Sequence, residues 1–99
     1  MTVLFTRIGT PVPGHQLDAI EYAKARRDAV NKNYALHAEI YVRFGGPVGQ
    51  VVMVESFEDM GAVERMKRAC YADDVKHKIP HSPAGTFQSI EEHAWIKLD

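Results

Sequence analysis

The sequence has 99 residues, enough for one domain covering residues 1–99, and a chain of this length buries only somewhat more than ~60% of its unfolded surface. Its composition, 45% hydrophobic and 25% charged, is that of an ordered globular protein and excludes a disordered chain. Twelve basic and thirteen acidic residues leave a net charge of −1, which offers no electrostatic attraction for nucleic acid or an anionic membrane.

Cysteine usage and hydropathy predict where the protein works. Cys70 is the only cysteine and cannot form an internal disulfide, so nothing indicates an oxidising compartment. The first residues, MTVLFTRIGT, lack the basic and apolar regions of a signal peptide, and no run of about 18 apolar residues occurs. We therefore expect a cytoplasmic protein without a membrane span.

The first half of the chain predicts a strand, a helix and a second strand. Residues 2–13, TVLFTRIGTPVP, have a strand pattern that ends at its prolines. From His15 to about Asn31 we expect an amphipathic helix, with Arg27 inside its apolar stripe and Arg26 outside it. The apolar residues of that stripe are Leu17, Ile20, Ala23, Val30 and Tyr34. Residues 35–46, ALHAEIYVRFGG, alternate between apolar and polar side chains and predict a strand.

The second half predicts a hairpin, a return strand, another helix and a last strand. The glycines and proline of GGPVG close the hairpin, and the apolar run 51–54 returns antiparallel. Ser56 and Asp59 are typical of a capping box, with Ser56 as the N-cap of the second helix. The buried stripe expected on that helix is Met60, Val63, Met66, Cys70 and Tyr71. A loop or broken helix follows, and then a strand in SIEEHAWIKL.

This order, β-α-β-β-α-β, favours an α+β fold, the ferredoxin-like split sandwich. Two right-handed crossovers place both helices on one face of a four-stranded antiparallel sheet, in the spatial order 4-1-3-2. The helices therefore cover one face only, and the alternation predicts which residues they cover. The expected helix-side residues are Leu4, Ile8, Leu36, Ile40, Val42, Val52, Val54, Ile90, Ala94 and Ile96.

The opposite face is predicted to be partly apolar and partly charged. Its expected residues are Val3, Phe5, Arg7, His37, Glu39, Tyr41, Arg43, Val51, Met53, Glu55, Glu91, His93, Trp95 and Lys97. Such a surface is too apolar to face water alone and too charged to be a plain core. We therefore expect a second subunit, a ligand or both to cover it.

Three segments make the chain resemble the dimeric α+β barrel proteins, which include antibiotic-biosynthesis monooxygenases, NIPSNAP-type domains and stress-responsive A/B barrel proteins. They are PVPGHQLDAI, YVRFGGPVGQVVMVESFEDMGAVERM and YADDVKHK. The last is similar to the Tyr-x-x-His-Pro-x-His pattern of the stress-responsive group at Tyr71 and His77, whereas Asp74 and Val75 replace its first His and its Pro. The resemblance implies a homodimer with its sheets packed face to face and a cavity for a flat aromatic or polyketide-like molecule or haem.

The face predicted to point away from the helices carries the candidate site. His37, His93 and Trp95 are the candidate catalytic residues, since an imidazole can remove a phenol proton while an arginine stabilises the anion. The candidate ligand-binding residues are Phe5, Arg7, Tyr41, Arg43 and Met53. The strands of His37 and His93 form opposite edges, about 14 Å apart, so their cooperation needs a partner subunit or a large ligand. The alternative is that these residues form the dimer interface.

A metal site is not predicted. His77 and His81 have the spacing of a helical ligand pair, but Pro80 lies between them and no third ligand has a fixed spacing. Surface histidines are the favoured interpretation, and no cofactor is assigned.

Two functions stay open for the whole chain. The first is a cofactor-independent, monooxygenase-like enzyme acting on a small aromatic or polyketide-like compound. The second is a non-catalytic small-ligand-binding or dimerisation module. An RNA-binding RRM shares the element order, but its third strand stacks bases on aromatic residues, where this chain has Val51, Met53 and Glu55.

Overall fold

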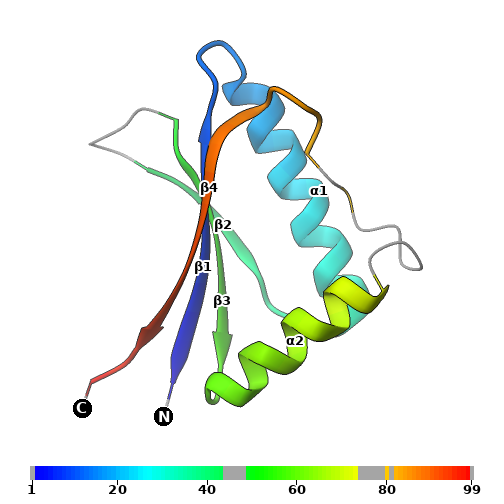
Figure 1. Cartoon of the computed structure of the whole chain (residues 1–99), viewed down its shortest axis with the longest axis vertical. Coiled ribbons are helices and arrows are strands. Elements are labelled where there is room, and N and C mark those ends of the chain that lie inside the picture. The colour runs from blue at the N-terminus through cyan, green and yellow to red at the C-terminus, as the bar shows by residue number, and fades with distance from the viewer. Residues whose placement is uncertain (1, 44–48, 74–79, 81, 99) are drawn as a thin grey trace.

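The computed structural model describes residues 2–43, 49–73, 80 and 82–98, which form one sheet and two helices (Figure 1). The elements in chain order are β1 (Val3–Pro11), α1 (Gln16–Tyr34), β2 (Glu39–Val42), β3 (Val51–Phe57), α2 (Met60–Asp73) and β4 (Phe87–Ile96). The strands pair antiparallel in the order β2-β3-β1-β4. The predicted ferredoxin-like fold is confirmed. The hairpin residues Gly45, Gly46 and Pro47 lie outside the described residues.

Both helices lie on the same side of the sheet, as Figure 1 shows. Val30 of α1 packs with Ala38 and Met53, and Val63 of α2 packs with Val3 and Phe5. β4 stays exposed from Gln88 to Ile96, and β2 is exposed except at the half-buried Ile40, so the helices cover the two central strands, β1 and β3, best. We call the uncovered side the open face, and its residues include Leu4, Thr6, Ile8, Tyr41, Val52, Val54, His93 and Trp95.

The end of α1 sets where β2 begins. Ala35 has a left-handed φ of 52° and terminates the helix beyond its predicted end. The Asn31 side chain then donates to the Ala38 carbonyl at 3.2 Å and accepts from the Ala38 amide at 2.8 Å. These bonds take up the backbone groups that a longer strand would use. β2 therefore begins at Glu39 and not at Ala35.

The cap of α2 is Asp59, so the prediction of Ser56 as the N-cap is wrong. The Asp59 Oδ1 accepts a hydrogen bond from the Ala62 amide at 2.8 Å, which is the usual bond from an N-cap side chain to the third helical residue. Ser56 is still part of β3 and pairs with Leu4 of β1. The strand thus runs past the residue that the sequence pattern assigned to the helix start.

The predicted faces are right for β2 and β4 and wrong for β1 and β3. The helices cover the odd-numbered residues of β1 and β3, among which Val3, Phe5, Val51 and Met53 are 0–8% exposed. The residues found instead on the open face are Leu4, Ile8, Val52 and Val54. Both faces of these two strands are apolar, so an alternating pattern does not distinguish them. A shift of one residue reverses every side chain.

The inward side of α1 also differs from the prediction. Leu17, expected in the stripe, is 75% exposed. Arg26, expected outside it, lines the space between α1 and the sheet and donates to the Pro80 carbonyl at 3.0 Å. Arg27 instead pairs with the neighbouring carboxylate of Asp28 at 3.0 Å. The expected positions of the two arginines are therefore reversed.

Candidate functional site

The predicted site residues are divided between the two sides of the sheet. Tyr41, Arg43, His93 and Trp95 lie on the open face. Phe5, Arg7 and Met53 lie on the helix side, because β1 and β3 turn their odd-numbered residues inward. His37 lies before β2 and is exposed. The prediction that all of them share one surface is wrong, since the sheet itself separates the two groups.

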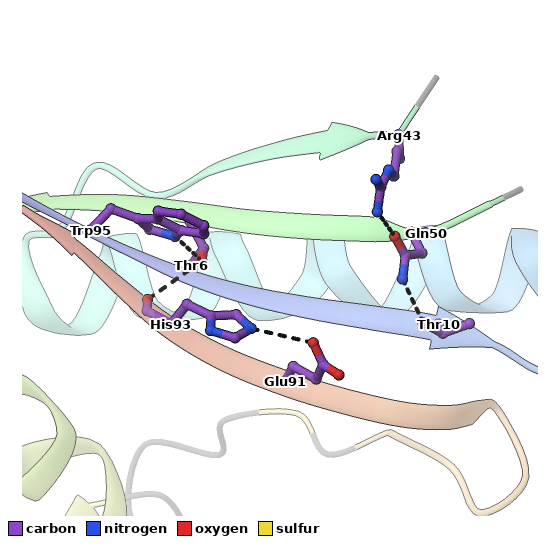
Figure 2. Close-up of polar contacts among 7 residues, drawn as sticks. All are labelled: Thr6, Thr10, Arg43, Gln50, Glu91, His93 and Trp95. Carbon is purple, nitrogen blue, oxygen red and sulfur yellow. Dashed lines mark hydrogen bonds and ion pairs between the residues drawn. The ribbon is translucent and has the colours of Figure 1, made fainter. Parts of the chain in front are cut away.

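A small polar network orients the aromatic residues of β4 on the open face (Figure 2). The Trp95 indole N–H donates to the Thr6 hydroxyl oxygen at 2.9 Å, and the Thr6 hydroxyl donates to the His93 carbonyl at 3.4 Å. The His93 Nε2 lies 3.3 Å from a Glu91 carboxylate oxygen, and the centroids of the His93 and Trp95 rings are 5.9 Å apart. Both residues remain about half exposed, 46% for the side chain of His93 and 55% for Trp95.

The residues of β2 form separate contacts. The Tyr41 hydroxyl donates to the Glu39 carboxylate, and this hydrogen bond raises the pKa of the phenol, which stays neutral at physiological pH. Gln50 accepts from Arg43 at 2.7 Å and donates to the Thr10 hydroxyl at 2.8 Å (Figure 2). β2 and β4 are the two edges of the sheet, so one chain does not bring Tyr41 to His93.

The described part of the chain has neither a metal centre nor a membrane-spanning helix. Within those residues, no three His, Cys, Asp or Glu side chains come together as a metal site, and neither helix is long and apolar enough to cross a bilayer. His77 and His81 lie outside the described residues.

Two adjoining hollows lie between the helices and the sheet, and we call them together the inner pocket. They share Arg7, Arg26 and Met53. The first is also lined by Gly9, Tyr22, Ala23, Val51, Phe87 and Ile90. The second is also lined by Phe5, Val30, Glu55, Met66, Lys67, Cys70, Tyr71 and Glu92. In each, the centre of a water molecule can occupy about 30 Å³, enough for one or two waters or a small polar head group.

Glu55 is the most perturbed acid in the inner pocket. Only 3% of the residue is exposed, and this burial raises the pKa of its carboxyl to about 7. The charges of Arg26 and Arg7 act to lower that pKa, whereas Glu92 acts to raise it, and burial has the largest effect. A carboxyl with this pKa is present in both protonation states at neutral pH. It can therefore take up or release a proton there.

The charges around Glu55 come from every neighbouring element. Arg7 comes from β1, Arg26 from α1, Lys67 from α2 and Glu92 from β4. The Lys67 ammonium lies 3.5 Å from a Glu92 carboxylate oxygen and 5.6 Å from the centroid of the Phe5 ring. Three cations thus surround two carboxyls, so the pocket is net positive even when Glu55 is ionised.

Three solved structures illustrate what the whole chain is similar to. A NIPSNAP-like domain protein from Burkholderia xenovorans superimposes with a TM-score of 0.76 at 13% identity, covering 98% of this chain and 85% of that one. A NIPSNAP family protein from Agrobacterium tumefaciens superimposes with a TM-score of 0.74 at 14% identity, covering 100% of this chain and 95% of that one. A second protein from Burkholderia xenovorans, a NIPSNAP domain protein, superimposes with a TM-score of 0.78 at 10% identity, covering 97% of this chain and 94% of that one. Searches against protein-family models and against curated proteins found no match.

The fold is that of the NIPSNAP domains. The resemblance to NIPSNAP-type domains that the sequence predicted is confirmed as a likeness of fold. Identities of 10–14% do not carry the residues of a site from one protein to another. The chemistry of the inner pocket therefore depends on the side chains of this chain alone.

Sequence reasoning missed the acid of the inner pocket and one of its two arginines. Glu55 and Arg7 were noted on strands, but on the wrong face, and Arg26 was placed outside the stripe of α1. A signal was present in β3, where Glu55 follows Val51 and Met53 at intervals of two and therefore shares their face. Because both faces of β3 are apolar, this phase marks Glu55 as a functional candidate only once the structure shows that Val51 and Met53 are the buried set, since burying an acid is costly.

Proposed function

We propose that the protein is a homodimeric, cofactor-independent enzyme of the monooxygenase type, whose reaction takes place in the inner pocket. Its substrate class would be a small aromatic or polyketide-like compound with an acidic C–H bond. The observation that carries this proposal is the carboxyl of Glu55, which is 3% exposed, has a pKa of about 7 and lies among Arg7 and Arg26. A base of this kind is matched to proton removal at neutral pH.

The reaction follows from those charges. The Glu55 carboxylate takes a proton from a ring CH₂ of the substrate, and the electron pair that remains spreads to the ring oxygen, where Arg7 and Arg26 stabilise it. The resulting carbanion reduces O₂ and forms a C–O bond to it. Loss of water then leaves a ring C=O, so one CH₂ and one O₂ become one C=O and one H₂O. Neither a metal nor a flavin is needed to balance these steps.

The open face is proposed to be the dimer interface. A compact monomer of this mass would expose about 5,700 Å², whereas the chain exposes 6659 Å². The excess is close to the ~800 Å² that each partner of a standard interface buries. At such an interface the half-exposed Trp95 and His93 would contact the partner subunit, which is the alternative to a catalytic role that the sequence left open for them.

Oxygen uptake with a panel of anthrones and quinols tests the proposal. Glu55→Gln keeps the shape of the side chain but removes the base, so turnover should fall about 100-fold or more. His93→Ala is the matched control, because it removes an ionisable group from the opposite face. The reverse result, with His93→Ala inactive and Glu55→Gln active, would move the chemistry to the open face.

A non-catalytic ligand-binding or dimerisation module is the second candidate. The free volume of about 30 Å³ in each hollow favours a dimerisation module, because neither an aromatic substrate nor an aromatic ligand fits unless the pocket opens. A parent protein that binds members of the panel without consuming oxygen would support this second function over the first.

A further inference from the structure

Two buried polar atoms in the inner pocket lack hydrogen-bond partners. Among the described residues, these are the Arg26 Nε, a donor, and the Glu55 Oε2, an acceptor. Both residues line the second hollow. Leaving a buried donor or acceptor unpaired destabilises the folded chain, so such atoms are uncommon in the absence of a function. One residue that lines the hollow thus has an unpaired donor and another has an unpaired acceptor, and a ligand group that carries both an acceptor and a donor would pair with both.

We infer that the inner pocket binds the carboxyl group of a small organic acid. One carboxyl oxygen of the ligand accepts from the Arg26 Nε, and the other shares a proton with the Glu55 Oε2. This inference goes beyond the proposed function, because an acid held in this way occupies Glu55 and Arg26 and would compete with the substrate of the proposed reaction. Both unpaired atoms become satisfied by one ligand group.

The charge of the pocket selects an acid over an amide. A primary amide also offers an acceptor and a donor, but it is neutral. Arg7, Arg26 and Lys67 outnumber Glu55 and Glu92, so the surroundings favour a ligand that brings negative charge. The proton shared with Glu55 then removes the repulsion between the two carboxyls.

The size of the pocket limits how much of the ligand enters. About 30 Å³ accommodates the carboxyl group, and the rest of the acid must lie outward from it. Tyr71 lines the same hollow and is 70% exposed, so its ring provides an apolar contact at the rim. An aromatic acid fits this division between a polar end and an apolar end.

Binding of such an acid should be linked to protonation of Glu55. The groups that face this carboxyl are Arg7 of β1, Arg26 of α1, Lys67, Cys70 and Tyr71 of α2, and Glu92 of β4. The pKa of Glu55 is about 7, so its protonated fraction falls about tenfold between pH 6 and pH 8. The affinity for a carboxylate ligand should fall by the same factor.

Isothermal titration calorimetry with benzoate as the probe tests the inference without any turnover. Wild type should bind benzoate about tenfold more tightly at pH 6 than at pH 8, and in preference to benzamide. Glu55→Gln, whose amide can still donate, should bind without that pH dependence. Arg26→Lys keeps the charge but lacks Nε and should weaken binding, whereas the matched Arg27→Lys should not.

Two outcomes would overturn the inference. One is equal affinity for benzoate and benzamide, and the other is an unchanged pH dependence in Glu55→Gln. An enzyme that binds benzoate as expected but consumes no oxygen with any compound would refute only the proposed reaction. Failure of the carboxyl site and failure of the oxygenase are thereby distinguished.

Discussion

Replacing Glu55 by Gln should make the protein more stable at alkaline pH, although it removes the proposed base. Below pH 4.5 the carboxyl is protonated in the folded and the unfolded chain, so it adds no pH dependence there. Between pH 4.5 and about 7 the unfolded chain releases the proton while the folded chain retains it. The free energy of unfolding therefore falls across this window and stays low above it.

The size of this effect follows from the pKa of the folded protein. Raising the pKa from 4.5 to about 7 corresponds to about 3 kcal/mol of lost stability above pH 7. Because only 3% of Glu55 is exposed, solvent screening reduces this value little. The neutral amide of Glu55→Gln should recover most of it at pH 8, and almost none at pH 4.

Urea unfolding followed by far-UV circular dichroism at pH 4, 6 and 8 measures this difference. The exposed Glu64 of α2 supplies the matched control, since Glu64→Gln removes the same charge without changing a buried group. If the stability of Glu55→Gln and of wild type differs by a constant amount at all three pH values, Glu55 is not a buried acid of raised pKa. The reasoning about the inner pocket would then be refuted as well.

Four further substitutions test the fold and the interface. Asp59→Ala should cost about 1 kcal/mol in urea unfolding because it removes the cap of α2, whereas Ser56→Ala should stay within about 0.5 kcal/mol; the opposite ranking would restore Ser56 as the cap. Phe5→Ala should cost about 3–5 kcal/mol, and a loss below 1 kcal/mol would place Phe5 outside the core. Ile8→Lys should convert a dimer into a folded monomer in light scattering, and an unchanged mass would exclude the open face as the interface.

Much of the fold was predictable because it depends on local pattern. The alternation of residues 39–42, the valine-rich run at Val51 and the amphipathic stretch before Tyr34 each identify an element without reference to the rest of the chain. Their order then leaves the ferredoxin-like sheet as the natural closure, with its strand order following from the handedness of the crossovers. The predicted edges, β2 and β4, are correct for this reason.

Element ends were less predictable, because side chains compete for the same backbone groups. Asn31 binds both backbone groups of Ala38 and shortens β2, so His37 lies outside the strand on which it was expected. Asp59 rather than Ser56 satisfies the first turn of α2. In each case a side chain binds backbone groups that another partner could satisfy, and the geometry of the packed chain decides between the two.

The sequence by itself determined the elements, their order and the need to cover two apolar faces. Only the tertiary structure decided which face of β1 and β3 the helices cover, and hence that Phe5 and Met53 lie in the core. It also decided that Arg7, Arg26 and Glu55, from three different elements, meet in one pocket. Periodicity within a strand is equal for its two faces, and the choice between them depends on packing against residues far away in the chain.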